Sequence, residues 1–230
     1  MIELNKLNFR WHPGASILIN IPEFTIKAGE NVFLEGPSGC GKTTLLNILS
    51  GIIIPETGFV KINGVELTQI NSAARDKFRA DHIGIIFQMF NLIPYLSPIE
   101  NVSLPCKFSR KRSKVARTNS DNVKAEARRL LAQMKLSADT IINSPAYELS
   151  MGQQQRVAAA RSLIGAPPLI VADEPTSALD RNVRQTFMNL LFDEVAASGS
   201  TLLFVSHDPD LGERFDRRVT FSDINKRTLR

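Results

Sequence analysis

The feature that most constrains this chain is a glycine-rich loop, residues 36–43, set between a buried strand and a helix. The loop reads Gly-Pro-Ser-Gly-Cys-Gly-Lys-Thr and matches the pattern G-x-x-x-x-G-K-[ST] in full. Residues 31–35 before it are typical of a short buried strand, and the apolar residues of 45–49 recur at helical spacing. A strand, a phosphate-binding loop and a helix in direct succession predict a nucleotide-binding site.

The spacing of the loop has a chemical reason. Glycines let backbone N–H groups point at phosphate oxygens, and the following helix offers its positive N-terminus. Lys42 is expected to reach the β- and γ-phosphates, and the Thr43 hydroxyl to ligate Mg²⁺. A chance glycine-rich turn is the alternative, which the flanking strand and helix disfavour. The residues expected to contact nucleotide are Gly36, Pro37, Ser38, Gly39, Cys40, Gly41, Lys42, Thr43 and Thr44.

A second candidate site ends the apolar segment 169–173, Leu-Ile-Val-Ala-Asp. Asp173 is expected to hold Mg²⁺, and Glu174 to polarise the attacking water. The alternative is a strand-ending turn before Pro175 with a helix cap. The phosphate loop upstream favours the functional interpretation.

The rest of the chain has the pattern of an α/β protein. Short apolar segments that alternate with helical patterns predict a parallel sheet covered on both faces. A hydrophobic fraction of 43% is enough for such a core. The strands expected are 2–9, 17–26, 31–35, a hairpin over 58–67 turning at Asn63-Gly64, 83–88, 169–172 and 201–205; the helices expected are 121–134, 153–164 and 183–197, with residues 89–156 mostly helical.

A third motif indicates which class of phosphate-loop protein this is. Residues 149–156, Leu-Ser-Met-Gly-Gln-Gln-Gln-Arg, resemble the signature motif of ABC-type ATPases. The other motifs of that family follow in the same order. Gln88 resembles the Q-loop glutamine, residues 177–180 the D-loop with Asp180, His207 the switch histidine, and Trp11 the aromatic residue that stacks on adenine.

The resemblance covers essentially the whole chain and implies its fold and activity. It implies an α/β P-loop NTPase (RecA-like) core with an N-terminal antiparallel β subdomain and an inserted α-helical subdomain. The single ABC ATPase domain, 1–230, would comprise a nucleotide-binding core of 1–88 and 156–230 and a signature-bearing helical subdomain of 89–155. The implied activity is hydrolysis of ATP with Mg²⁺. The implied catalytic residues are Glu174, His207, Gln88 and Lys42, and the implied magnesium ligands are Thr43, Gln88 and Asp173.

The resemblance also implies a head-to-tail homodimer with ATP between the subunits. Ser150, Gly152 and Gln153 of one subunit would meet nucleotide held by the other, and Asp180 would act across the dimer. Taken singly, His207 is explained equally well as a turn residue. For Trp11, ordinary surface packing is the alternative. Met151 departs from the family pattern, in which glycine is usual; a position that needs positive φ would be strained by methionine.

The sequence predicts a protein without a membrane-spanning segment of its own, which would work with a separate transmembrane subunit. The longest apolar stretch, 48–54, stops at Pro55, short of the ~20 residues that span a bilayer. Cys40 and Cys106 cannot build a disulfide framework and fit a reduced cytosol. We expect a cytoplasmic subunit, peripheral on the cytoplasmic face of the cell membrane, with a separate transmembrane permease. Residues 87–102 resemble the lipoprotein-releasing, macrolide-exporting and cell-division branch of the family.

The segment 107–117 holds six basic residues and no acidic one, while the whole chain carries a net charge of +5. A solvated basic loop or helix end is one interpretation, and contact with anionic lipid head groups or with an acidic partner is another. The run is too short for a distributed nucleic-acid face, so no nucleic-acid partner is expected. The alternative function is that of a non-transport ABC ATPase acting on DNA or ribosomes, whose members typically carry two ATPase halves or long coiled-coil insertions.

Overall fold

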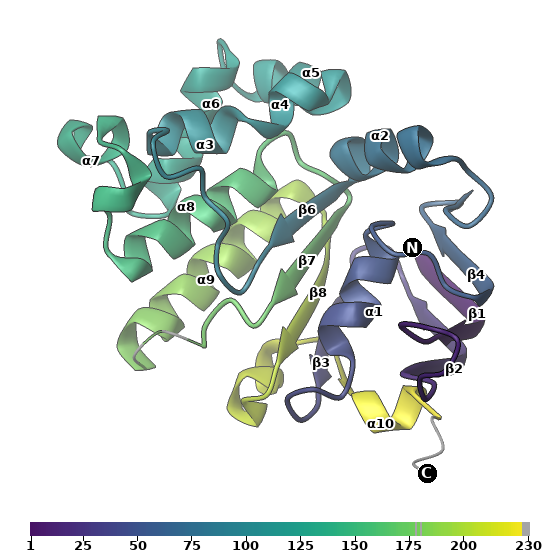
Figure 1. The fold of residues 1–230 in the computed structure, drawn as a ribbon. Helices are drawn as coiled ribbons and strands as arrows, with labels where there is room; N and C mark the ends of the chain where they lie inside the picture. Colours follow the sequence, from purple (N-terminus) through teal and green to yellow (C-terminus); the bar gives the residue numbers. More distant parts are fainter. Residues whose placement is uncertain (178, 180, 227–230) are drawn as a thin grey trace. The chain divides into compact units, whose positions relative to one another are not determined.

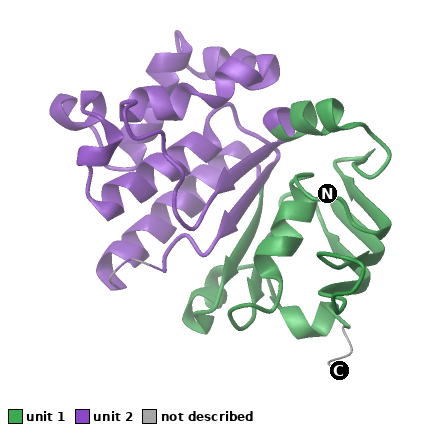
Figure 2. Ribbon diagram, in the orientation of Figure 1, with its two compact units in different colours: residues 1–79, 201–230 green, residues 80–200 purple. Residues whose placement is uncertain are grey.

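The computed structural model describes residues 1–177, 179 and 181–226. The chain divides into two compact units, the first formed by 1–79 with 201–230 and the second by 80–200 (Figure 2). Within the described ranges, none of the helices combines the length and apolar character that a bilayer crossing requires.

The first unit contains an antiparallel sheet of order β2-β1-β4-β5 and a group of parallel strands in which β3 pairs with both β8 and β9 (Figure 1). Among the described residues of this unit, two α-helices and one 3₁₀ helix lie wholly within it, and α2 spans the boundary at residue 79. The bounds are β1 Ile2–Phe9, β2 Ile19–Ile26, β3 Asn31–Glu35, α1 Lys42–Leu49, β4 Thr57–Ile62, β5 Val65–Glu66, α2 Ser72–His82, β8 Thr201–Ser206, the 3₁₀ helix η2 Pro209–Arg214, β9 Arg217–Thr220 and α10 Phe221–Ile224.

A bulge in β1 explains how its apolar residues all reach one core. Ile2 and Leu4 are two residues apart, but Leu7 and Phe9 have the opposite parity, and all four are buried. The pairing of β1 with β4 shifts between Asn5 and Asn8, next to the left-handed Lys6 (φ 49°). One extra residue in the strand restores the inward direction of the side chains that follow it.

The second unit is mainly helical, with the parallel strands β6 and β7. Helix α8 lies directly on β6, because a Cβ atom on Gly84 would come within 2.2 Å of the carbonyl oxygen of Ser162. The bounds are β6 Ile83–Ile86, α3 Pro98–Ser103, α4 Pro105–Phe108, α5 Arg110–Asn119, α6 Val123–Gln133, α7 Asp139–Asn143, the 3₁₀ helix η1 Ala146–Glu148, α8 Met151–Leu163, β7 Leu169–Asp173 and α9 Arg181–Ser198.

The predicted α/β class is confirmed, with its N-terminal antiparallel sheet and its helices inserted between β6 and β7. The hairpin at Asn63-Gly64 is also found, with both turn residues at positive φ. Helix α2 was not predicted, because it is polar on most sides and buries only Phe78, which leaves no apolar periodicity in the sequence. The short elements η2, β9 and α10 were not predicted either.

Candidate nucleotide site

The phosphate loop runs from the end of β3 into the first turn of α1. Gly39 and Gly41 have φ angles of +76° and +115°, which other residues rarely adopt. Gly41 is the N-cap of α1, no side chain of the described residues caps this helix, and its first turn contains no acidic residue. A glycine loop that leads into a helix N-terminus without a side-chain cap is an arrangement that binds phosphate groups.

The ammonium group of Lys42 hydrogen-bonds the backbone of the phosphate loop. Its side chain is 5% exposed, and Nζ donates to the carbonyl oxygens of Gly36 at 2.7 Å and Pro37 at 2.9 Å. Thr43 beside it is exposed, and Thr44 is buried. An ammonium group, a glycine backbone and an exposed hydroxyl suit phosphate oxygens and a magnesium ion, which prefers oxygen ligands. The residues present therefore fit Mg-ATP.

A charged pair stands where β3 enters the loop. Glu35, the last residue of β3, accepts from Arg218 at 2.6 Å and from the Thr220 hydroxyl at 3.0 Å. The donation from Arg218 holds the pKa of the Glu35 carboxyl below its usual value. The sequence analysis missed this pair, since only the pairing of β3 with β9 brings the residues together.

His207 is at the same edge of the sheet as the phosphate loop. β3 and β8 are parallel with Glu35 opposite Ser206, so the residues that follow both strands leave at one end. His207 is exposed, and the Ser206 hydroxyl accepts from the backbone N–H of Asp208 at 3.1 Å. The first unit therefore brings Lys42 and His207 to one edge.

The second unit gathers Gln88, Asp173 and Glu174 at one edge of its own strand pair. β6 and β7 are parallel with Ile86 opposite Ala172, so these side chains follow strand ends on the same side. Asp173 is 9% exposed, whereas Gln88 is exposed. Carboxylate and amide oxygens are ligand types that Mg²⁺ accepts. Of the residues predicted to serve magnesium and water, these three are thus grouped within the second unit, and Thr43 belongs to the first.

Glu174 has an unusual backbone conformation. Its φ is 45°, in the left-handed region, which costs a residue other than glycine about 1–2 kcal/mol. Such strain concentrates at functional sites. The alternative interpretation of Asp173 and Glu174 was a strand-ending turn with a helix cap. The turn is present, because the N–H of Ser177 donates to the Glu174 carbonyl at 3.2 Å. Helix α9, however, begins only at Arg181, so neither Asp173 nor Glu174 caps it.

The segment after Gln88 is held by an arginine of α8. Arg161 donates to the carbonyl oxygens of Phe90 and Asn91, two consecutive residues at positive φ. Burial lowers the pKa of Arg161 to about 10, so its guanidinium stays charged at neutral pH. This link fixes the main chain just beyond Gln88 to the helix that carries the signature segment.

The signature segment is the N-terminus of α8. The Ser150 hydroxyl accepts from the N–H of Gln153 at 3.3 Å, and the Gln153 side chain accepts from the N–H of Ser150 at 2.8 Å, which makes a capping box. Ser150 is exposed, and Gly152 is half-buried. Met151 is the first helical residue and has no positive φ, so methionine causes no backbone strain at this position.

Gln155 joins α8 to the turn that holds Glu174, a link the sequence analysis missed. The side chain is fully buried, and its Nε2 donates to the carbonyl oxygen of Pro175. Its Oε1 has no hydrogen-bond partner among the described residues. The only local signal was a glutamine followed by the buried apolar positions 157–160 of the same helix.

We expect Gln155→Met to lower kcat several-fold while KM for ATP stays near the wild-type value. The methionine fills the same volume but cannot donate to Pro175, so Glu174 loses a restraint on its position, while the phosphate loop keeps its contacts. Steady-state hydrolysis measured against ATP concentration separates the two constants. Gln133→Met, at an exposed glutamine of the same unit, is the matched control. A variant with lower melting temperature and unchanged kcat would make Gln155 purely structural.

Two further predicted residues have different outcomes. Trp11 follows β1 with 61% of its surface exposed, and its ring meets Phe9 edge-on with centroids 5.2 Å apart. Because the indole contacts Phe9 edge-on and is otherwise exposed, one of its faces is available for a base to stack on. Asp180 lies outside the described residues.

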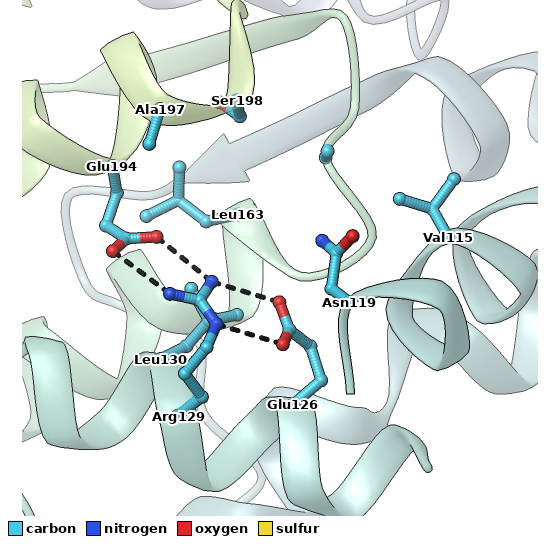
Figure 3. A pocket seen from close by; sticks show the side chains of 10 residues that line it. Val115, Asn119, Glu126, Arg129, Leu130, Leu163, Glu194, Ala197 and Ser198 are labelled. Carbon is cyan, nitrogen blue, oxygen red and sulfur yellow. Dashed lines mark hydrogen bonds and ion pairs between the residues drawn. The ribbon is translucent and has the colours of Figure 1, made fainter. Parts of the chain in front are cut away.

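A pocket of about 260 Å³ in the second unit lies apart from the predicted residues (Figure 3). Arg129 of α6 lies between Glu126 of the same helix and Glu194 of α9, at 2.9 Å and 3.2 Å. These carboxylates raise the pKa of Arg129. Because its charges already pair with one another, the cluster joins α6 to α9, and we assign it a structural role.

Comparisons with known proteins place the chain in a family. The model of the ABC transporter family matches residues 19–177. The chain is 42% identical over 202 residues to the ABC transporter ATP-binding protein YbbA of Escherichia coli K12, covering 88% of this chain and 84% of YbbA. It is 38% identical over 201 residues to the lipoprotein-releasing system ATP-binding protein LolD of Cytophaga hutchinsonii, covering 87% and 88%.

A solved structure agrees with these relatives. A dimeric post-hydrolysis state of the ATP-binding cassette MJ0796 of Methanocaldococcus jannaschii, bound to ADP and Pi, superposes with a TM-score of 0.84 at 35% identity, covering 96% of this chain and 94% of that one. The resemblance drawn from the motifs, including the branch that contains LolD, is confirmed. With a family match over most of its length and relatives that align nearly end to end, this chain belongs to the ABC transporter family as one of its ATP-binding proteins.

Proposed function

We propose that this chain is the ATP-hydrolysing subunit of an ABC transporter, in which ATP joins two copies and hydrolysis separates them. The observation that carries the proposal is the exposed signature segment at the N-terminus of α8. There an exposed serine hydroxyl stands at the positive end of a 13-residue helix. The capping box uses the N–H groups of Ser150 and Gln153, so the backbone donors offered to an anion from outside the chain are those of Met151 and Gly152. The MJ0796 cassette, which is dimeric and bound to ADP and Pi, supports a dimer that holds nucleotide.

In the proposed reaction, water attacks the γ-phosphorus of ATP and ADP leaves. Glu174 accepts a proton from the attacking water. Lys42 binds the β- and γ-phosphates, and His207 hydrogen-bonds the γ-phosphate. Mg²⁺, when bound, neutralises phosphate charge, and the residues proposed to hold it are Thr43, Gln88 and Asp173.

The proposed dimer is head to tail. Ser150, Gly152 and Gln153 of one copy meet the nucleotide on the phosphate loop of the other. Trp11 stacks on the adenine, and Asp180 acts across the dimer. Each site then needs both chains, which makes ATP part of the interface and makes its hydrolysis the event that opens the interface.

The proposed partner is a separate transmembrane permease, which would hold this chain at the cytoplasmic face of the membrane. In the proposed division of the domain, 1–88 and 156–230 form the nucleotide-binding core and 89–155 form the helical subdomain that bears the signature. Within that subdomain, the region around 89–105 receives the permease. Met89 and Tyr95 are 77% and 74% exposed, and the exposed Tyr147 (64%) lies beside the segment that leads to Tyr95, since its N–H donates to the Pro94 carbonyl at 3.1 Å. Exposed apolar side chains on one segment and on its neighbour favour a protein contact.

A pull-down of the tagged chain from the membrane fraction of its own cells tests this function. We expect a polytopic membrane protein to co-purify in a stable ratio, and ATP hydrolysis to change when that protein is present. Co-purification of ribosomes or DNA in its place would favour the non-transport alternative and contradict the proposal. A chain with Met89 and Tyr95 both replaced by Ser keeps the nucleotide residues and is expected to lose the membrane partner.

A further inference from the structure

Helix α5 carries a concentrated positive surface that nucleotide chemistry does not use. Of the six basic residues in 107–117, five are exposed: Lys107, Arg110, Lys111, Lys114 and Arg117. Arg110, Lys114 and Arg117 recur at i, i+4 and i+7, which places them on one face of the helix. Together with Cys106, Ser113 and Thr118 they line a hollow of about 450 Å³, called here the basic hollow.

The sixth basic residue, Arg112, explains how α5 holds this surface outward. Arg112 is 3% exposed and donates to the carbonyl oxygens of Ile164 and Ser162 at the end of α8, both at 2.7 Å. Burial lowers its pKa to about 10, so it stays charged at neutral pH. One cation thus fixes the helix to the unit, and the other five point to solvent.

No carboxylate of the described residues forms an ion pair with the cations of the basic hollow. Among the described residues, none of Arg110, Lys114 and Arg117 is within ion-pair distance of an acidic side chain. The buried carboxylate of Glu126 accepts instead from Ser120 and Arg129. Burial raises the pKa of the Cys106 thiol, so Cys106 adds no negative charge to the hollow at neutral pH. The Thr118 hydroxyl donates to the Lys114 carbonyl at 3.1 Å. The hollow therefore presents three cations and the Ser113 hydroxyl, a donor set suited to an oxyanion such as a phosphate group.

A large apolar side chain stands next to these cations. Phe108 ends α4, two residues before Arg110, and 72% of its surface is exposed. An exposed aromatic ring beside lysines and arginines is typical of surfaces that bind the interface of an anionic bilayer. Protein interfaces are depleted of lysine, yet three of the five exposed cations are lysines. This composition favours a membrane over an acidic protein.

We propose that the basic hollow and Phe108 dock onto the anionic phospholipid headgroups of the membrane, with the headgroup phosphate in the hollow. The inference rests on the proposed function in one respect, because the permease is what brings this chain to a bilayer. Binding of the isolated chain to vesicles and its ATP hydrolysis are measured separately, so either can fail without the other.

The test is co-sedimentation of the full-length chain with vesicles of phosphatidylcholine alone or mixed with phosphatidylglycerol. We expect binding to the anionic vesicles to be at least about tenfold stronger, and to fall as salt is raised. Arg110→Glu with Lys114→Glu should lose about tenfold or more of that binding. Phe108→Ala should weaken the binding that persists at high salt, because that part is apolar.

The matched control is Arg128→Glu with Lys135→Glu, two exposed cations of the same unit outside the hollow. Each pair of substitutions lowers the net charge from +5 by four, to +1. An equal loss of vesicle binding in both double variants would mean that only the total charge matters, and would overturn the proposal. Equal binding to neutral and anionic vesicles would overturn it as well. So would capture of a glutamate-rich peptide without vesicle binding, which indicates a protein partner, or complete displacement by inorganic phosphate at constant ionic strength, which indicates a soluble anion.

Discussion

Replacing Glu174 with glutamine is expected to leave ATP binding intact and to lower steady-state hydrolysis by at least about 100-fold. The amide has the shape of the carboxylate but cannot accept the proton of the attacking water. Because the ATP between two copies is then not consumed, the variant should accumulate as a dimer in ATP and return to monomer in ADP. Hydrolysis assays, with gel filtration in each nucleotide, measure both effects.

Glu23→Gln, which neutralises an exposed carboxylate on β2, is the matched control and should behave as wild type. Near-normal turnover of Glu174→Gln would remove Glu174 from the catalytic role. Lost turnover without the dimer would keep the catalytic assignment and reject ATP as the link between subunits. The left-handed φ of 45° at Glu174 makes glutamine the safest replacement, since it has the same backbone preferences.

Lys42→Ala is expected to weaken ATP binding by about 1.5–3 kcal/mol, roughly 10- to 150-fold in Kd, through the loss of a charge-assisted bond to phosphate. Titration with a fluorescent ATP analogue measures the loss. Lys27→Ala removes an exposed lysine of the same unit and controls for net charge. Since Lys42 also bonds the carbonyls of Gly36 and Pro37, a melting curve must show that the variant is folded. An unchanged affinity for ATP would contradict the assignment of residues 36–43 as the phosphate-binding loop.

Mixing tests whether the signature acts on the partner's nucleotide. Neither Lys42→Ala nor Ser150→Arg subunits should hydrolyse ATP alone. A heterodimer of the two keeps one site with an intact loop and an intact partner signature, so mixing should restore at most half of the activity per dimer. If the wild-type chain had full activity as a demonstrated monomer, the head-to-tail dimer with ATP between its subunits would be rejected.

Much of the site could be predicted from the sequence, because many of its functional groups lie close together along the chain. The spacing of residues 36–43 fixes which backbone and side-chain groups can meet a phosphate, and the strand before it and the helix after it are where the pattern predicts them. The same holds for Asp173, the last residue of β7, with Glu174 after it, and for Ser150 and Gln153, whose capping box joins residues three apart.

The links between these motifs are not readable in this way. Gln155 reaches Pro175, Arg161 reaches Phe90 and Asn91, and Arg112 reaches the end of α8, over 20, about 70 and about 50 residues of sequence. Each bond is made to a backbone carbonyl, which every residue possesses, so no partner side chain marks it. The basic run 107–117 was likewise visible, but not that one of its six cations points inward.

By itself, the sequence determined the α/β class, the order of the motifs and the chemistry of the loop, because these follow from residue type and short spacing. Only the tertiary structure decided that β1 needs a bulge at Lys6 to bury Leu7 and Phe9, that Met151 takes an unstrained helical conformation, and that Glu174 is left-handed. The physical reason is that these outcomes depend on pairing and packing between segments distant in the chain, whereas propensity and periodicity report only on neighbours along it.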